Sequence, residues 1–364
     1  MADARAVSAV RPDTEAFVTP RLTSLTHGGG CGCKLPPSVL EKIISGSSAP
    51  LQPFASLLVG AETSDDAAVY LIDDERAVVA TTDFFTPIVD DPFDFGRIAA
   101  ANALSDVYAM GGKPLLALAI VGMPVKQLGL EAVGRILDGG ASVCASAGIP
   151  VAGGHSIDVS EPIYGLAVVG IVGRNRILRN DCAQSGDCLI LTKPLGIGVY
   201  SAALKQGLLQ GAEYREMVAT ATQLNSIGAE LQDHFPVSAA TDVTGFGLLG
   251  HILEMCRGAK LTFRLRSADV PLLTEAQRFA RAGVRTGAAK RNWASYSDSV
   301  KLSSSPEPWW TDLLCDPQTS GGLLIATAAG NIQEALKFLH RSGFEHARVI
   351  GRFEHGPPEL QIEF

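Results

Sequence analysis

Charge, aromatic rings and long apolar runs are all scarce in this 364-residue chain. Charged residues make up 19% of it, below the roughly 25% typical of soluble globular chains, so we expect much of the surface to be buried in a core or a subunit interface. The most apolar run, 114–125, spans only 12 residues, whereas a membrane-spanning helix needs about 20. The chain is therefore not expected to have a membrane partner.

A disulfide framework, a leader peptide and a basic block are missing too. The seven cysteines are an odd number scattered along the chain, unlike the dense, even framework of small secreted domains. Residues 1–20 carry five charges and lack the apolar core of a signal peptide, so a cytoplasmic protein is expected. With 30 basic and 38 acidic residues the net charge is −8, which argues against a nucleic-acid partner and is unfavourable for a polyphosphate ligand.

The order of the elements predicts an α+β fold of about two domains, since a domain holds roughly 150 residues. A Gly-rich segment, 26–34, is expected as a mobile arm, followed by a short helix over 37–45. The first unit is expected to contain a hairpin of strands 67–72 and 77–82, helix 94–110, strand 115–122, helix 131–147 and strand 164–172. A second unit is expected from 175 onward, with strands at 187–192, 237–241 and 322–327 and helices at 214–231 and 248–256.

Aspartates at the ends of these elements form the strongest candidate site. Asp65 and Asp66 are adjacent before a strand, Asp83 closes an apolar strand, and Asp106 shares a helix face with Asn102. Carboxylates from several elements suit Mg²⁺, which prefers oxygen ligands and binds together with substrate phosphates. The alternatives are a turn or capping role for Asp65 and a satisfied core hydrogen bond for Asp83 or Asp106.

Two cysteines in the Gly-rich arm form the second candidate site. Cys31 and Cys33 are followed directly by Lys34. A nearby lysine lowers the pKa of a thiol and favours the reactive thiolate. Zinc binding is a poor alternative because no second cysteine pair stands at ligand spacing, and an exposed tail with incidental thiols is the other. Cys144 and Cys256 fall on apolar helix faces and are expected in the core.

Three glycine-rich segments carry weaker signals. Residues 245–250 match G-x-G-x-x-G, but the acidic residue expected about 20 positions on at a strand end is missing, so a dinucleotide site is disfavoured. Residues 152–158 are expected as a loop whose backbone N–H groups face a phosphate or a base. Residues 316–322 predict a rigid turn. No P-loop motif is present in the sequence, so ATP binding requires another arrangement.

In this order, the motifs resemble the selenophosphate synthetase family, the selenide, water dikinases. The resemblance runs from about Arg21 to the C-terminus and rests on the segments 27–34, 65–69, 81–85, 102–106, 111–114, 153–158, 241–247 and 316–322. It implies a homodimer with two α/β domains of the aminoimidazole-ribonucleotide-synthetase type and a flexible Gly-rich N-terminal arm. The implied reaction makes selenophosphate, AMP and orthophosphate from ATP, selenide and water.

The resemblance also implies a role for each matching residue. Cys31 stands where the family has cysteine or selenocysteine, and Lys34 matches the essential lysine beside it; these are the expected catalytic residues. The expected metal ligands are Asp66, Asp106 and Asp242. The expected ATP contacts are Lys34, Thr63, Ser64, Asp65, Asp83, Asp106, Gly154, His155 and Ser156, the last three as candidates to come from a partner subunit. Mg²⁺ is the expected cofactor, with a monovalent cation as a further candidate, and metal held by the aspartates reverses the local charge that a polyphosphate meets.

The expected organisation has three parts: residues 1–50 as the arm with the Cys/Lys motif, 51–174 as an ATP-binding and dimerisation domain, and 175–364 as a C-terminal domain. Two alternatives stay open at this point. One is a related ATP-using synthetase or kinase of the same superfamily, which would not need Cys31 or Lys34. The other is a non-catalytic selenium or metal carrier that uses the C-x-C arm.

Overall fold

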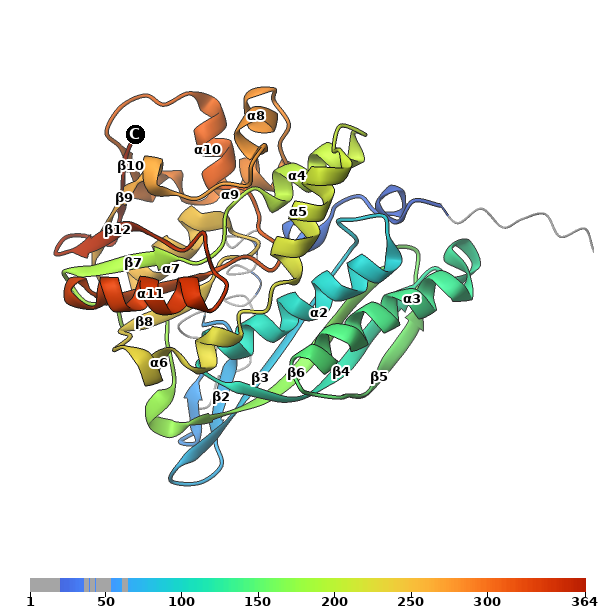
Figure 1. Cartoon of the computed structure of the whole chain (residues 1–364), viewed down its shortest axis with the longest axis horizontal. Helices are drawn as coiled ribbons and strands as arrows, with labels where there is room; N and C mark the ends of the chain where they lie inside the picture. The colour runs from blue at the N-terminus through green and yellow to red at the C-terminus, as the bar shows by residue number, and fades with distance from the viewer. Residues whose placement is uncertain (1–19, 36–38, 40–42, 44–53, 61–64) are drawn as a thin grey trace, which may run out of the picture.

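The computed structural model describes residues 20–35, 39, 43, 54–60 and 65–364. Its N-terminal half contains a six-stranded sheet in the order β1-β2-β3-β6-β4-β5. The strands are β1 Leu57–Val59, β2 Ala68–Leu71, β3 Arg76–Phe85, β4 Lys113–Met123, β5 Val151–Asp158 and β6 Ile163–Gly173. Helices α2 (Pro92–Ala109) and α3 (Val125–Ser146) lie side by side over one face of this sheet (Figure 1).

Helix α2 is the element that carries polar groups into the interior. It begins where the Asp91 side chain accepts a hydrogen bond from the N–H of Asp94, with Pro92 in the first turn, and it ends before Gly111, which has a φ of 75°. Nearly all of its length is buried, including Asn102, Ser105 and Asp106. Polar side chains at such positions require partners, and the functional site supplies them.

A seven-stranded sheet in the order β10-β13-β9-β12-β7-β11-β8 forms the C-terminal half. Its strands are β7 Asp187–Leu191, β8 Ala239–Asp242, β9 Thr262–Arg266, β10 Val300–Leu302, β11 Leu323–Ala328, β12 Arg348–Glu354 and β13 Leu360–Glu363. The helices of this half are α4 Ile197–Lys205, α5 Gly211–Thr222, α6 Leu231–His234, α7 Gly247–Ala259, α8 Ala276–Arg281, α9 Gly287–Tyr296, α10 Pro308–Leu314 and α11 Ile332–Arg341. None of the helices described is long and apolar enough to cross a membrane.

Most predicted elements are confirmed, including the β2–β3 hairpin with Ala68 opposite Ala80. Cys144 and Cys256 lie in the core as expected. Two predictions are wrong. The expected loop 152–158 is the edge strand β5, which pairs in parallel with β4. The expected helix 214–231 stops at Thr222, because the Asn225 side chain turns inward to donate to Ser105 and to the Gly321 carbonyl. Most of the expected helix over 37–45 lies outside the described residues.

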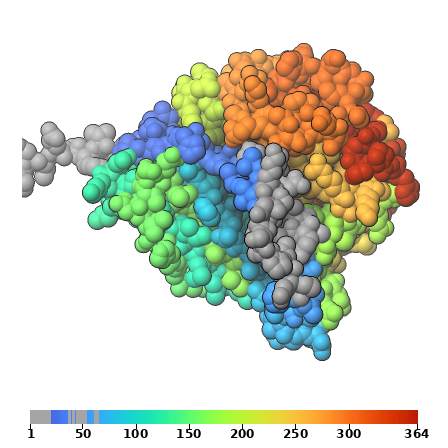
Figure 2. All heavy atoms as spheres, turned by 180° about the vertical axis from the view of Figure 1, so that it is seen from behind, coloured from blue at the N-terminus to red at the C-terminus, as the bar shows by residue number. Residues whose placement is uncertain are grey.

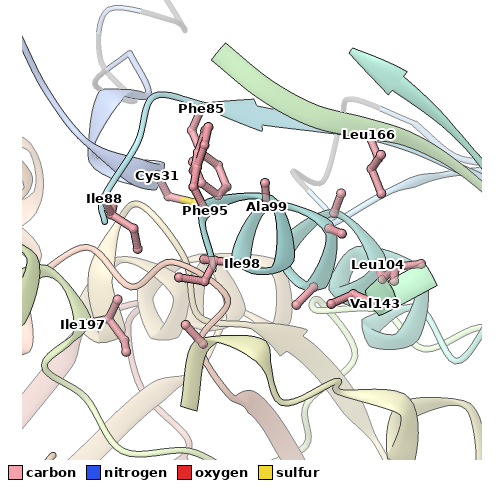
Figure 3. Close-up of a cluster of buried hydrophobic side chains, with 14 of the residues drawn as sticks. Cys31, Phe85, Ile88, Phe95, Ile98, Ala99, Leu104, Val143, Leu166 and Ile197 are labelled. Carbon is pink, nitrogen blue, oxygen red and sulfur yellow. The ribbon is translucent and has the colours of Figure 1, made fainter. Parts of the chain in front are cut away.

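The expected arm is packed between the two halves in this structure. Residues Gly30–Cys33 form a 3-10 helix, and the blue N-terminal residues lie between the cyan-green and the orange parts of the molecule (Figure 2). Cys31 is 1% exposed and belongs to the core cluster that contains Phe85, Ile88 and Phe95 (Figure 3). The reading of this segment as an exposed tail is therefore excluded.

Candidate functional site

The Cys31 thiol is held at the junction of the two halves. Its sulfur donates to Asn102 Oδ1 on α2 (3.2 Å), and its backbone N–H donates to the hydroxyl of Thr319 (3.2 Å). Asn102 Oδ1 also accepts from the N–H of Ser320 (2.7 Å), a residue with a φ of 55°, in the left-handed region that non-glycine residues rarely adopt. A single buried amide thus links the arm to the turn at 316–322.

The same amide connects Cys31 to Asp83 and Lys34. Asn102 Nδ2 donates to Asp83 Oδ2, and Lys34 Nζ lies 3.4 Å from that oxygen. Burial acts to lower the pKa of Lys34, but the negative groups around it, Asp83 first among them, together outweigh burial and the pKa is raised. Lys34 is therefore a persistent cation, although its side chain is still 39% exposed.

The thiol itself behaves differently from the expectation drawn from the motif. Lys34 does act to lower the pKa of Cys31, but burial and the charge of Asp83 outweigh it, so the pKa lies well above its usual value. A thiolate activated by Lys34 is therefore not present in this conformation, chiefly because the thiol is buried. Cys31 is a neutral hydrogen-bond donor here.

Three carboxylates approach one another across the two halves. Asp66 precedes β2, Asp106 lies on α2, and Asp242 ends β8. Each accepts one short hydrogen bond from a hydroxyl: from Thr241 to Asp66 (2.8 Å), from Thr81 to Asp106 (2.6 Å) and from Ser105 to Asp242 (2.5 Å). Burial raises the pKa of all three, and Asp242 further raises the pKa of Asp66 and of Asp106.

The chemistry of this group fits a hard cation such as Mg²⁺. Asp66 Oδ2 is enclosed and has no hydrogen-bond partner among the described residues, and like charges held together out of water are relieved by a cation. Within the part of the chain that the structure describes, no three His, Cys, Asp or Glu side chains are arranged to hold a metal ion. Asp66, Asp106 and Asp242 therefore do not form a metal site by themselves in this conformation.

The other predicted residues fall into three groups. Asp65 accepts from the N–H of Asn180 (2.8 Å) and so joins the segment between the two sheets. Thr63 and Ser64 lie outside the described residues. Gly154, His155 and Ser156 lie on β5, three strands from β3, which is about 14 Å at the usual spacing of roughly 4.8 Å per strand. The structure does not bring these three together with the carboxylates of the same chain.

Several functional contacts were missed by sequence reasoning. They come from hydroxyl and amide side chains, namely Thr81, Ser105, Asn225, Thr241 and Thr319. Each is buried or partly buried. For Thr81, Ser105, Asn225 and Thr241, a polar residue beside an apolar one was the available signal, whereas Thr319 stands in a polar turn and offered none. Only Asn102 was noticed on that ground.

The chain matches known family models and shares its fold with solved structures. The family model for the AIR synthase related protein, N-terminal domain, matches residues 64–172, and that for the C-terminal domain matches residues 184–362. Two solved structures share the fold. A thiamine-monophosphate kinase from Stenotrophomonas maltophilia K279a is 21% identical, with a TM-score of 0.61 over 85% of this chain and 92% of that one. A HypE–HypF complex is 14% identical, with a TM-score of 0.65 over 90% and 96%.

Two curated relatives are much more similar in sequence. The selenide, water dikinase of Burkholderia ambifaria (strain MC40-6) is 58% identical over 353 residues, which is 96% of this chain and 99% of the relative. That of Pseudomonas straminea is 58% identical over 344 residues, which is 94% and 96%. Identity of this extent over nearly the full length shows that the chain belongs to the selenide, water dikinase family and consists of two AIR synthase related domains.

Proposed function

We propose that the chain makes selenophosphate from ATP, selenide and water and releases AMP and orthophosphate. The observation that carries the proposal is a pair of contacts at one site: the Cys31 thiol donates to Asn102, and Lys34 pairs with the buried carboxylate of Asp83. The chain that holds this site is 58% identical to a selenide, water dikinase. A purine or thiamine-type kinase would have no use for a buried thiol beside a lysine, and a pure carrier would have no use for the carboxylates.

Cys31 and Lys34 are proposed as the catalytic residues. The raised pKa of Lys34 keeps its ammonium group charged, which suits it to bind a phosphate oxygen. The neutral thiol of Cys31 is aligned by Asn102, and movement of Lys34 from Asp83 to a phosphate would leave that amide contact in place. The packed arm excludes water from the reacting groups, which protects an intermediate from hydrolysis.

Asp66, Asp106 and Asp242 are proposed to hold Mg²⁺. When bound, the metal would neutralise charge on the phosphates of ATP, and phosphoryl transfer depends mainly on such neutralisation and on positioning. The hydroxyls of Thr81, Thr241 and Ser105 orient the carboxylates through the hydrogen bonds described above. Asp83, Asp65, Thr63 and Ser64 are proposed as ATP contacts.

A homodimer is proposed because the described residues leave one face of the first sheet uncovered. Tyr70, Phe84 and Leu118 are 50%, 48% and 40% exposed, whereas Phe85 on the opposite face is 3% exposed. Apolar side chains exposed on one face of a sheet mark an interaction surface. A second copy on this face would offer Gly154, His155 and Ser156 a partner site that they lack in their own chain. Residues 51–174 are accordingly proposed as the ATP-binding and dimerisation domain.

Product analysis tests the proposal. The purified protein is incubated with ATP and Mg²⁺, with and without selenide under anaerobic conditions, and the nucleotides are separated by chromatography. AMP and orthophosphate are expected only when selenide is present. ADP as the sole final nucleotide, or product formation that ignores selenide, would contradict it. Cys31→Ser and Lys34→Ala are expected to abolish selenophosphate formation while ATP still binds.

A further inference from the structure

A cavity of about 550 Å³ borders the Gly-rich arm. It is lined by the arm from His27 to Leu35, by one side of α4 and by the start of α9. None of Asp66, Asp83, Asp106 and Asp242 lines it. The cavity is therefore a second space beside the arm, separate from the carboxylates described above.

The charge of this cavity is opposite in sign to that of the whole chain. Its described lining contains the basic residues Lys34, Lys205, Arg285 and Arg291 and no acidic residue, although the chain carries a net charge of −8. Lys34 is paired with Asp83 (3.4 Å) and Arg285 with Asp312 (2.9 Å). The surplus positive charge therefore rests on Lys205 and Arg291.

Lys205 and Arg291 form no ion pair with any described residue. Lys205 Nζ donates to the carbonyl of Gly28 (2.6 Å), and Arg291 Nη2 donates to the carbonyl of Gly32 (3.0 Å). A carbonyl oxygen carries no formal charge, so both cations keep their attraction for an anion in the cavity. Burial lowers the pKa of Lys205 more than Cys33, Asp90 and Glu161 together raise it, and an anion bound in the cavity would further favour the charged form.

A smaller space adjoins this cavity next to Cys31. It has a volume of about 10 Å³, shares Gly32, Lys34 and Arg291 with the cavity and is also lined by Cys31. A volume of about 10–15 Å³ holds roughly one water molecule. The basic cavity and the Cys31 thiol are therefore neighbours across this narrow space, and the lining at Lys34 and Arg291 has to widen for an ion to reach the thiol.

We propose that this basic cavity is an anion-binding vestibule that receives hydroselenide and delivers it to Cys31, with Lys205 and Arg291 supplying the attraction. The inference rests on the proposed function. Hydroselenide is a monoanion at neutral pH, and the carboxylate side of the arm repels it while no metal is bound and is occupied by Mg·ATP once it is. The cavity is larger than the bare ion and accommodates its hydration shell. The two anionic substrates thus reach the site from different sides, ATP at the carboxylates and selenide through the vestibule.

Steady-state kinetics at saturating Mg·ATP test the vestibule. Lys205→Gln and Arg291→Gln remove the charge but keep an N–H donor for the arm carbonyl. Each is expected to raise the KM for selenide about fivefold, the effect of one unit charge a few ångströms away in water, with little change in the KM for ATP. Lys205→Arg is expected to restore the wild-type value. Lys290→Gln, an exposed lysine of α9 outside the cavity, serves as the matched control and is expected to match the wild type.

Four results would overturn the vestibule. The first is an unchanged KM for selenide in both Lys205→Gln and Arg291→Gln, and the second is an equal rise of that KM in Lys290→Gln. The third is a fall in the kcat of Lys205→Gln that Lys205→Arg does not reverse. The fourth is weaker inhibition of the charge variants by added orthophosphate while their KM for selenide stays unchanged. The last result would assign the cavity to the phosphate product. Wild-type protein that forms no AMP with selenide would refute the proposed function instead, so the two failures are distinct.

Discussion

Replacement of Asp66 by Asn is expected to stabilise the metal-free protein and to abolish its response to Mg²⁺. Asp66 Oδ2 is enclosed without a partner among the described residues, and burial, followed by the charges of Asp242 and Asp106, raises the pKa of the residue, so the ionised form is unfavourable here. Asn keeps the oxygen that accepts from Thr241 (2.8 Å) and removes the charge. An unsatisfied buried polar group costs about 1–3 kcal/mol, and we expect a gain in the free energy of unfolding of about 1–2 kcal/mol.

Thermal unfolding followed by circular dichroism measures this effect. In metal-free buffer the midpoint of Asp66→Asn is expected above that of the wild type. With Mg²⁺ and a non-hydrolysable ATP analogue, the wild type gains stability by linkage and the variant does not, so the order of the two midpoints reverses. The control is Asp187→Asn, since Asp187 is buried at 4% exposure but accepts from Gln184 N–H (2.8 Å). It is expected to lose stability in both buffers.

An Asp66→Asn midpoint below that of the wild type in metal-free buffer would refute the reasoning, because the carboxylate would then be well solvated or paired. An equal gain from Mg·ATP in both proteins would remove Asp66 from the metal ligands. Either result leaves the hydrogen bond from Thr241 as the main role of the side chain.

Three further predictions concern other parts of the molecule. Asn102→Ala removes the acceptor for Cys31 and Ser320 and the donor to Asp83. We expect the free energy of unfolding, measured in urea, to fall by about 3 kcal/mol. We also expect iodoacetamide to alkylate Cys31 faster, as measured by peptide mass spectrometry. Burial lowers the pKa of Lys193 to about 7. Between this pH and the ordinary lysine pKa of about 10.4, the unfolded chain binds a proton that the folded chain lacks, so the free energy of unfolding is expected to rise with pH. This rise, measured by urea unfolding, should vanish in Lys193→Met. Phe84→Glu places a charge on the uncovered sheet face and is expected to shift a dimer to monomer in sedimentation velocity.

Local patterns were sufficient to predict the elements that dominate the fold. Helix α2 has an N-terminal Asp-Pro pair and a Gly-Gly stop, and the β2–β3 hairpin alternates around a charged turn, so each carries its own signals. Strand β5 was missed because its glycines suggest a loop. Gly154 is required there, since a Cβ would lie 2.1 Å from the Ala119 carbonyl on the neighbouring strand. That contact exists only in the folded sheet.

The site was predictable as far as charged groups and nucleophiles define it. Asp66, Asp106 and Asp242 were identified from different motifs, and the structure brings them into mutual electrostatic range. Their protonation behaviour was not predictable, and neither was that of Cys31, because a pKa depends on burial and on partners distant in sequence. Asp83 stands 52 positions after Cys31 yet outweighs the lysine three residues away.

The glycines of the arm illustrate the same limit. In sequence they indicate freedom of the backbone, whereas in this structure they are required for close packing. Gly30 has a φ of 56°, and a Cβ there would lie 2.3 Å from Thr319 Oγ1 and 2.5 Å from Ile88 Cγ2. A glycine thus has two different meanings in this segment: freedom of the backbone in the sequence, and close approach to Thr319 and Ile88 in the folded protein.

The distribution of charge matters more to this protein than its net value of −8. Screening limits Coulomb interactions to about 8 Å at physiological ionic strength, so an anion responds to the groups around it and not to the total. The arm carries Cys31 on the side of Asn102 and Asp83, and Cys33 borders the basic cavity. The proposed metal-binding carboxylates and the proposed anion cavity lie on different sides of this segment. On that proposal, correct seating of the arm is a condition for keeping the two anionic substrates apart until they react.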